Sequence, residues 1–342
     1  MSKYKVGIYG IGNVAIEYIK AFNNNPLTRI AVAVTRNKEK TEKKLKSFGF
    51  NDIEVINDYD ELVKRKDIDI ICITGPHFLH AKETIKAVNE DKHVMVEKPL
   101  GMTFKEVLEV YKAVKKSGVK TQQGTPILYN PFVLNVLKLV DRGHLGKIFY
   151  IEADNSHNFA ADWGGWKWGH HTKKGGPSAV LSTGIHAIAF LRRCAGEVEE
   201  VFGYQTWGWK KEYEYGPTFT AVLKFKDGAI GNTYSTYENV SPYTRNFIIH
   251  GTKGSIMNDK YYIKDLFPGQ MGWQKFNTKM PDSGAVSHHA FGDLVNDFID
   301  SIENNKQSAV NIEESLKIHE ICYAITKSIE TGKIVKLPFM DY

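Results

Sequence analysis

The stretch KVGIYGIGNVA, residues 5–15, joins a hydrophobic strand to a glycine turn only a few residues from the start of the sequence. Gly10, Gly12 and Ala15 fit the G-x-G-x-x-G/A spacing ahead of a helical pattern over residues 14–22. Gly10 permits the tight turn, Gly12 lets main-chain N–H groups approach a pyrophosphate, and Ala15 lets the helix pack close to the strand. Any tight strand-to-helix turn could need such glycines, but the order strand, turn, helix predicts a dinucleotide site at the helix N-terminus.

Length and composition indicate an ordinary globular protein of two domains. The 342 residues are many for a single hydrophobic core, and the apolar and charged fractions of 42% and 25% are those of soluble domains. No apolar run approaches the ~18 residues that a membrane-spanning helix needs. No secretory signal precedes the first strand, so a cytoplasmic location is expected.

Charge and cysteine content argue against a nucleic-acid-binding protein and against one held together by disulfides or a metal. The net charge of +6 is modest, and the densest basic run, residues 38–46, has the spacing of a solvated helix face. No basic stripe is interleaved with stacking aromatic residues, so nucleic-acid binding is not expected. Cys72, Cys194 and Cys322 are far apart in apolar segments, which predicts reduced core thiols rather than a disulfide or metal framework.

The end of the second expected strand, residues 29–36, bears on the choice of cofactor. An acidic residue about 20 positions past the glycines would bind the ribose 2′-OH of NAD, but Thr35, Arg36 and Asn37 stand there. Arg36 offers a planar fork for a 2′-phosphate, Thr35 adds a hydroxyl, and nearby lysines add positive potential. A solvated arginine is the alternative. The sequence predicts a preference for NADP, with NAD also possible.

Two more strand ends are expected at the same ligand-binding edge. The apolar strand 69–73 ends in Thr74-Gly75-Pro76, and the strand 94–96 ends in Glu97-Lys98-Pro99. Because open α/β sheets bind ligands at the carboxyl ends of their strands, both tripeptides should face the cofactor. Proline restricts the residue before it, so Lys98 should be held where it can hydrogen-bond a hydroxyl and lower its pKa. A surface lysine paired with Glu97 is the alternative.

After Gly124 the alternation of strands and helices stops. The expected elements are a helix over 131–141, a strand over 148–156, a helix over 182–194, successive strands over 199–257, helices over 289–303 and 312–330, and a last strand over 334–337. The fold class is therefore α/β. We expect a Rossmann domain over 1–124 and an α+β domain over 125–342 whose large, open sheet is mostly antiparallel.

At this point the sequence resembles the Gfo/Idh/MocA family, the relatives of glucose-fructose oxidoreductase and inositol dehydrogenase. The resemblance rests on GIGNVA at 10–15, TGPHFLH at 74–80, KHVMVEKPL at 92–100, GHLGKI at 143–148, GGPSAVLSTGIH at 175–186 and the closing SIETGKIVKLP. It implies hydride transfer between NAD(P) and a sugar, inositol or related polyol. It also implies a homodimer or homotetramer formed through the C-terminal sheet.

The same resemblance assigns the chemistry to two residues. Lys98 matches the lysine of the family's E-K-P motif, with Glu97 as the carboxylate on the cofactor side, and His186 matches the histidine that ends its D-x-G-x-H motif. A histidine with a pKa near neutral suits transfer of the hydroxyl proton, while Lys98 polarises the same oxygen. Without the resemblance, His186 would be interpreted as a core histidine.

Three positions depart from the family pattern. Ser182 replaces the usual Asp of that motif, and His77 replaces the Asn of P-N-x-x-H, although Pro76 and His80 are kept. The segment TPILY, residues 125–129, lacks the usual basic residue. The substrate therefore cannot be taken from a relative.

The aromatic stretch WGGWKWGHH, residues 163–171, resembles the family's variable Trp-Arg loop, with Trp166 and Lys167 at the matching place. Aromatic faces stack on sugar C–H surfaces, and Lys167 could reach a hydroxyl or phosphate. Packing or an oligomer contact is the alternative. His170 and His171 invite a zinc site, but adjacent residues rarely point at one ion, so no metal is expected.

These observations give a set of site predictions. Lys98 and His186 are the expected catalytic residues, and Ser182, Trp166 and Lys167 the expected substrate contacts. Cofactor contacts are expected from Gly10, Ile11, Gly12, Asn13, Val14, Thr35, Arg36, Thr74, Gly75, Pro76, His80, Glu97 and Lys98. Two alternatives to a simple dehydrogenase stay open: an NAD-dependent glycosidase with transient redox chemistry, and a non-catalytic protein that senses dinucleotide or sugar, which the loss of Asp at Ser182 motivates.

Overall fold

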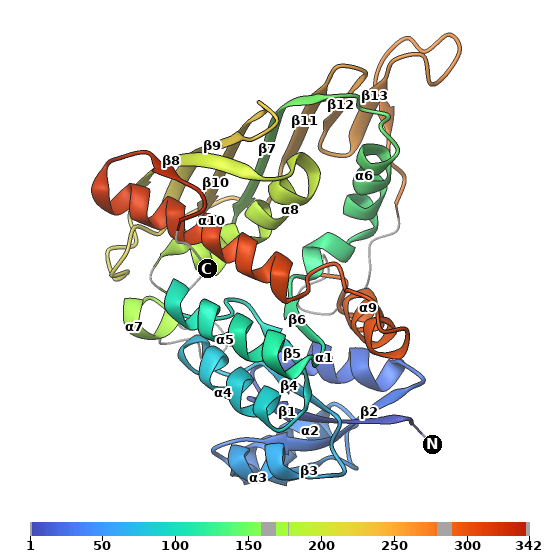
Figure 1. The fold of residues 1–342 in the computed structure, drawn as a ribbon, viewed down its shortest axis with the longest axis vertical. Helices are drawn as coiled ribbons and strands as arrows, with labels where there is room; N and C mark the ends of the chain where they lie inside the picture. The colour runs from blue at the N-terminus through green and yellow to red at the C-terminus, as the bar shows by residue number, and fades with distance from the viewer. Residues whose placement is uncertain (1, 159–168, 177, 279–288, 340–342) are drawn as a thin grey trace.

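The computed structural model describes residues 2–158, 169–176, 178–278 and 289–339, which form two sheets with helices around and between them (Figure 1). The first sheet is parallel and has the strand order β3-β2-β1-β4-β5-β6. Its strands are β1 (Tyr4–Tyr9), β2 (Thr28–Val34), β3 (Glu54–Ile56), β4 (Ile70–Ile73), β5 (His93–Glu97) and β6 (Thr121–Gly124). The helices between them are α1 (Asn13–Asn24), α2 (Lys38–Ser47), α3 (Tyr59–Lys64), α4 (His77–Asn89) and α5 (Phe104–Ser117).

This strand order reverses direction between β1 and β4. The chain moves from β1 to β2 on one side and from β4 to β5 on the other, so right-handed crossovers place α1 and α2 on one face and α4 and α5 on the opposite face. β4 is apolar and buried along its whole length, as a strand covered on both faces requires. The reversal leaves a crevice at the carboxyl ends of β1 and β4, where such folds bind ligands.

The second sheet has nine strands among the described residues, in the order β14-β13-β12-β11-β7-β10-β9-β8-β15. Its strands are β7 (Ile148–Ser156), β8 (Val198–Thr206), β9 (Thr218–Phe225), β10 (Ile230–Thr236), β11 (Phe247–Gly251), β12 (Gly254–Met257), β13 (Lys260–Ile263), β14 (Gln274–Lys275) and β15 (Val335–Lys336). Neighbouring strands are antiparallel except β7 and β10, which pair in parallel. Residues of β9 alternate between buried and exposed, so one face is covered and the other is open.

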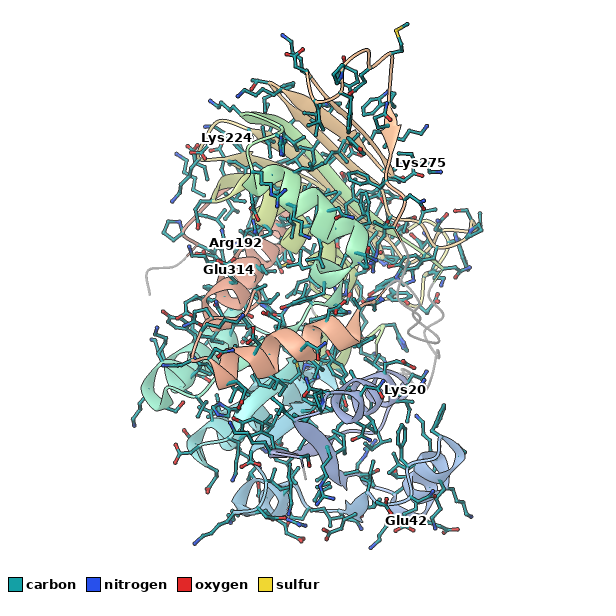
Figure 2. The ribbon with its side chains drawn as sticks, turned by 90° about the vertical axis from the view of Figure 1, so that its right-hand side faces the viewer. Lys20, Glu42, Arg192, Lys224, Lys275 and Glu314 are labelled. Carbon is teal, nitrogen blue, oxygen red and sulfur yellow. The ribbon has the colours of Figure 1, made fainter. Side chains whose placement is uncertain are left out.

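Helices from the second half of the chain cover that sheet and also return to the first. They are the 3₁₀ helix η1 (Pro126–Tyr129), α6 (Pro131–Asp141), α7 (Thr172–Gly175), the π-helical turn η3 (Val180–Gly184), α8 (Ile185–Ala195), α9 (Phe291–Glu303) and α10 (Ile312–Thr331). α10 packs on strand β8 of the second sheet and on helix α8, and it also packs on α5, a helix beside the first sheet (Figure 1). Buried Arg192 of α8 holds Glu314 of α10, with 3.0 Å between Nε and Oε2 (Figure 2).

The first sheet is completed by residues near the end of the chain. α9 packs against α1, and the main-chain N–H of Gln123 donates to the Val310 carbonyl oxygen at 3.1 Å. Gln122 and Asn311 form an isolated antiparallel bridge beside β6. The two sheets are therefore joined by packing as well as by the chain itself.

The structure confirms the predicted fold class and corrects some element bounds. The expected helix over 182–194 begins instead at Ile185, after the π-helical turn, and strands continue past residue 257 into β13 and β14. The short helices η1 and α7 were not predicted, since neither has a sustained apolar period. Cys72, Cys194 and Cys322 are buried free thiols, as expected. Within the described ranges, the helices are all too short or too polar to cross a membrane.

Candidate active site

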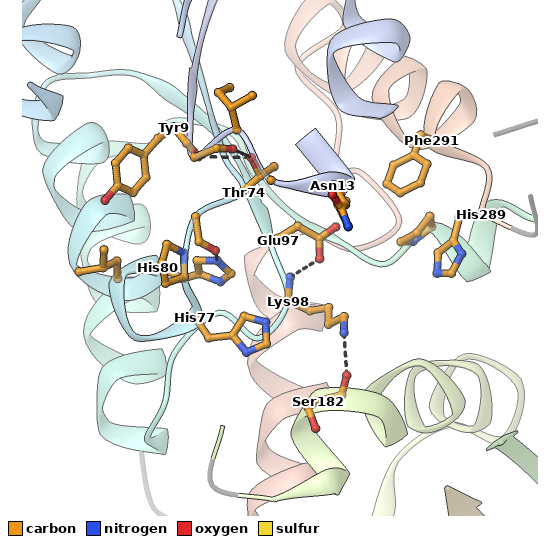
Figure 3. Close-up of a pocket in the computed structure, with 18 of the residues that line it drawn as sticks. Tyr9, Asn13, Thr74, His77, His80, Glu97, Lys98, Ser182, His289 and Phe291 are labelled. Atoms are coloured by element: carbon orange, nitrogen blue, oxygen red, sulfur yellow. Dashed lines mark hydrogen bonds between the residues drawn. The ribbon is translucent and has the colours of Figure 1, made fainter. Parts of the chain in front are cut away.

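A cavity of about 1300 Å³ lies between the carboxyl ends of the parallel strands and the second sheet (Figure 3). Pockets for one small molecule are typically ~300–1,000 Å³, so this space has room for two ligands side by side. The glycine turn, the end of β2 and the 74–77 and 97–98 segments line it from one side. Residues of β7, η3, α8 and the segment before β11 line it from the other.

The glycine turn fits a dinucleotide phosphate. Gly10 has φ +87°, and a Cβ there would lie 2.5 Å from the Gly75 Cα, so the turn and the 74–75 loop approach each other through glycine alone. A Cβ on Gly12 would meet nothing within 4 Å, which leaves open space beside the turn. No acidic residue lies in the first turn of α1, and no described side chain caps its N-terminus. The first N–H groups of α1 are therefore available to an anion.

Positive side chains gather at the end of β2. Arg36 is exposed and forms no ion pair with any described residue, and Lys40 lines the same part of the cavity. Lys44 crosses from α2 to the glycine turn, where its Nζ donates to the Gly12 carbonyl oxygen at 2.8 Å. Thr35 Oγ1 accepts from the Thr41 hydroxyl at 2.9 Å. Arg36 therefore lines the cavity and has no carboxylate partner among the described residues.

Glu97 and Lys98 lie together at the end of β5. Glu97 accepts the Tyr18 hydroxyl at 2.7 Å through Oε1 and the Lys98 main-chain N–H at 3.0 Å through Oε2. Burial raises the pKa of the Glu97 carboxyl and lowers the pKa of the Lys98 amine. Lys98 Nζ points away from Glu97 and donates to the Ser182 carbonyl oxygen at 2.6 Å (Figure 3). The lysine thus reaches across the cavity and is not paired with its neighbouring carboxylate.

Two buried histidines hold the loop that follows β5. His80 Nδ1 lies 2.7 Å from the Pro99 carbonyl oxygen, and its Nε2 lies 2.9 Å from the Gly75 carbonyl oxygen, so this ring ties the 74–76 and 97–99 segments together. His319 of α10 accepts the Leu100 N–H at 2.9 Å through Nε2, while its Nδ1 lies 2.7 Å from the Ser315 carbonyl oxygen. These partners fix His319 as a neutral ring that donates through Nδ1.

His77 joins the first sheet to the second half of the chain. Its Nδ1 lies 2.7 Å from the Gly175 carbonyl oxygen, in α7, and its ring centroid lies 5.4 Å from that of His80. Burial lowers the pKa of His77 well below its usual value, with the positive charge of Lys98 acting in the same direction. The replacement of the family's Asn by His77 therefore supplies a contact between the two halves.

His186 lies in the first turn of α8 and lines the same cavity as Lys98. Its side chain is buried, and its ring is edge-on to His289, with centroids 5.6 Å apart. His289 in turn stacks on Phe291 at the start of α9, at 5.8 Å. The structure thus brings both expected catalytic residues to one cavity from different halves of the chain.

Ser182 makes its contact with Lys98 through the main chain. It lies in the π-helical turn η3, and its hydroxyl donates to the Ser178 carbonyl oxygen at 3.1 Å. π-helical turns are rare in proteins, and those that occur are often found at functional sites. At this position the carbonyl oxygen faces Lys98.

The sequence reasoning missed a polar group on the other wall of the cavity. Asn155 at the end of β7 accepts the Arg245 Nε–H at 3.1 Å and the Tyr243 hydroxyl through Oδ1, and donates to Thr183 Oγ1 at 2.6 Å through Nδ2. His157 lies next to it, 5.1 Å from the Tyr243 ring. One signal was available in the sequence: three consecutive polar residues, 154–156, end the strand, and the structure buries all three.

Two of the expected substrate contacts, Trp166 and Lys167, lie outside the described residues. His170 and His171 are described, with ring centroids 4.0 Å apart, and His171 Nδ1 lies 2.8 Å from Glu214 Oε1. Across the described ranges, three or more metal-binding side chains nowhere gather closely enough to hold an ion.

Comparisons with known proteins find relatives for both parts of the chain. The model described as "Oxidoreductase family, NAD-binding Rossmann fold" matches residues 4–125, and that described as "Oxidoreductase family, C-terminal alpha/beta domain" matches residues 137–337. Levoglucosan dehydrogenase of Pseudarthrobacter phenanthrenivorans is 25% identical over 253 residues, which are 66% of this chain and 64% of that protein. Glycosyl hydrolase family 109 protein 1 of Phocaeicola vulgatus is 23% identical over 318 residues, 84% of this chain and 65% of that protein.

The solved structures show the same fold along the whole chain. A structure of levoglucosan dehydrogenase in complex with NADH and L-sorbose superposes with a TM-score of 0.89 at 21% identity, covering 99% of this chain and all of the other. The two family models together account for both halves of the chain. The chain therefore belongs to the Gfo/Idh/MocA family of oxidoreductases.

Proposed function

We propose that the protein transfers a hydride between a nicotinamide cofactor, preferably NADP, and a secondary alcohol or ketone of a sugar, inositol or related polyol. The observation that carries this proposal is that Lys98 and His186 line one cavity together with the glycine turn. A phosphate cradle and two proton-handling groups in one space are what this reaction needs. The nicotinamide, when bound, would accept or supply the hydride.

The residues of the cavity divide the remaining work. During oxidation the carbinol C–H leaves as hydride while the hydroxyl proton passes to His186, whose ring suits proton transfer near neutral pH. Lys98 donates a hydrogen bond to the same oxygen and stabilises the negative charge that develops there. Ser182 holds the lysine through its carbonyl oxygen, and Glu97 fixes the main chain of the lysine from behind. Reduction runs the same steps in reverse.

The remaining site residues contact or position the cofactor. We assign the glycine-turn contacts to Gly10, Ile11, Gly12, Asn13 and Val14, and the contacts on the facing segment to Thr74, Gly75, Pro76 and Glu97. His80 acts through the two loops that it joins. Ser182, Trp166 and Lys167 stay proposed substrate contacts.

A preference for NADP is supported by charge at the end of β2. Arg36, Lys40 and Lys44 line this end of the cavity, and the carboxylates of α2 are turned to other partners, Glu39 to Lys43 and Glu42 to Lys38. A ribose 2′-phosphate would find a guanidinium there, whereas a carboxylate for the NAD 2′-OH is missing from the described lining.

A second candidate function is the hydrolysis of a glycoside by transient oxidation at the same site. The similarity to a glycosyl hydrolase family 109 protein favours it, since the same cofactor and the same two residues would serve both reactions. Release of an aglycone without net change in the cofactor would distinguish it from a dehydrogenase.

We also propose a division of labour and a setting for the chain. Residues 1–124 bind the cofactor, and residues 125–342 bind the substrate and form oligomer contacts. Large apolar side chains are exposed on the open face of the second sheet: Tyr204 is 65% exposed, Val222 51% and Ile230 52%. Such a face suits a homodimer or homotetramer, which light scattering would measure. The buried free thiols suit a cytoplasmic protein.

The direct test mixes the purified protein with NADPH or NADH and a panel of sugars, inositols and their keto forms. We expect a change in the absorbance of reduced nicotinamide with at least one of them, and tighter binding of NADPH than NADH in a fluorescence titration. Absence of cofactor binding, or of any turnover across the panel, would contradict the proposal.

A further inference from the structure

Arg245 is a cation in the cavity wall that has no carboxylate partner among the described residues. It lies just before β11 and lines the cavity, where its Nε donates to Asn155 Oδ1 at 3.1 Å and its guanidinium carbon lies 5.1 Å from the Tyr243 ring centroid. Its Nη1 is buried and makes no hydrogen bond with any described residue. A buried guanidinium with an unsatisfied N–H is costly unless a ligand completes its contacts.

The surroundings of Arg245 hold it in place without neutralising it. Asn155 is fixed by its two bonds to Thr183, and the Tyr243 hydroxyl binds the same amide oxygen as the guanidinium. Every one of these partners is uncharged. The nearby Asp154 is occupied by Asn246, which donates to it at 2.8 Å from the main chain and at 2.7 Å from the side chain. The arginine is therefore oriented for a partner that the described residues do not supply.

The balance of charge in the cavity also indicates that the ligand brings an anionic partner for Arg245. Glu97 is the one carboxylate in the described lining, and it lies behind Lys98 on the cofactor side. Arg245 is close enough to Lys98 for its positive charge to lower the pKa of that lysine, after the larger effect of burial. Two cations thus face the substrate end of the cavity, and one anionic group on the substrate would offset the second of them.

We propose that the substrate is a sugar acid, whose carboxylate binds the Arg245 guanidinium while its reacting hydroxyl lies between Lys98 and His186. This inference deepens the proposed function and rests on it. A carboxylate fits better than a phosphate because it carries one charge and is planar, which matches a single guanidinium whose Nε is already engaged. Arg245 is then the residue that selects acids over neutral sugars.

Matched pairs of ligands test the inference by equilibrium binding to the protein saturated with NADP⁺. The pairs are D-glucose and D-glucuronate, D-galactose and D-galacturonate, and D-glucitol and D-gluconate, with D-glucose 6-phosphate added. We expect at least one acid to bind about ten- to a hundredfold more tightly than its neutral partner. If no acid binds more tightly than its partner, the inference is wrong. Tighter binding of the phosphate than of every acid would overturn the carboxylate assignment.

Variants show whether Arg245 is responsible. Arg245→Gln should weaken binding of the preferred acid by about ten- to a hundredfold and raise its KM, with binding of the neutral partner and of NADPH unchanged. Arg245→Lys, which keeps the charge and loses the fork, should retain part of the preference. Arg193→Gln is the control, since Arg193 is paired with Asp141 and lies about two turns along α8 from His186, outside the cavity lining. An acid preference that survives Arg245→Gln would contradict the assignment.

The results also separate this inference from the proposed function. Neutral sugars that are turned over, with acids bound no more tightly, would refute the sugar acid and leave the oxidoreductase standing. Acids that bind through Arg245, with no redox change in the cofactor for any sugar, would refute the oxidoreductase and leave the binding site standing.

Discussion

Lys98 Nζ lies 2.6 Å from the carbonyl oxygen of Ser182, although 84 positions of sequence separate the two residues. The bond joins the end of a parallel strand in the first sheet to a π-helical turn that leads into α8 of the second half. It aims the amine at the space between the two halves. The position that departs from the family motif therefore still takes part in the site, through an atom that every amino acid has.

Replacing Lys98 by Met removes the hydrogen-bond donor and keeps a side chain of similar length. We expect kcat/KM to fall by about 10²–10⁴, because the charge on the reacting oxygen would lose its stabilising donor. The dissociation constant of NADPH should change little. Steady-state kinetics and fluorescence titration measure the two quantities. Lys112→Met, on the exposed side of α5, is the matched control; an active Lys98→Met would exclude the proposed role.

Replacing His186 by Asn tests the proton transfer. Asparagine keeps a polar side chain of similar size but cannot accept the hydroxyl proton, so kcat should fall by about 10²–10⁴. NADPH binding should persist. The measurements are steady-state kcat and the dissociation constant of NADPH, with His144→Asn outside the cavity lining as the control. Turnover that survives in His186→Asn would place the proton acceptor elsewhere.

Arg36→Gln tests the choice of cofactor. Loss of the guanidinium should raise the dissociation constant of NADPH by about 10- to 100-fold and leave that of NADH nearly unchanged, since only NADPH carries the 2′-phosphate. Arg29→Gln changes an exposed arginine near the other end of β2 and serves as the control. Equal weakening of both cofactors would show that Arg36 contacts a part they share.

His319 predicts an acid limit to stability. Burial lowers the pKa of His319 from about 6.5 to about 4. Between these two pH values the histidine is therefore protonated in the unfolded chain and neutral in the folded protein. Stability is therefore full above pH ~6.5 and falls as the pH drops toward ~4, by about 3 kcal/mol for this residue. Burial also lowers the pKa values of His77 and His80, which act in the same direction.

Urea unfolding at several pH values measures this effect. His319→Gln keeps one acceptor and one donor but does not titrate, so its free energy of unfolding should decline less steeply between pH 6.5 and 4 than that of the unchanged protein. His144→Gln should decline like the unchanged protein. Parallel curves for His319→Gln and the unchanged protein would contradict the prediction.

Much of the fold could be predicted because its signals are local. The strand over 70–73 is fully apolar, and the helices over 77–89 and 131–141 begin and end where their periodicity and flanking residues indicate. The π-helical turn could not be predicted, since nothing in the sequence of residues 180–184 separates a π-helical turn from an α-helical one, and their contacts with Lys98 and β10 appear only in the fold.

Some residues of the site could likewise be predicted from the sequence, and others could not. Gly10, Lys98 and His186 stand in motifs with fixed spacing, so the sequence alone indicates them. Asn155 and Arg245 come together only when the ends of β7 and β11 pair in the sheet, and nothing in the local sequence of either residue indicates the other. A partly buried arginine that lacks a carboxylate partner among the described residues becomes visible only once its neighbours in the fold are known.

The packing of α9 on α1, and of residues 310–311 on β6, has a consequence for synthesis of the protein. The strands of the first sheet leave the ribosome long before α9 is made. Until α9 emerges, the apolar side of α1 lacks the helix that covers it in the folded protein. We expect a fragment that stops at Gly124 to aggregate, and the first sheet to reach its final packing only after α9 has been synthesised.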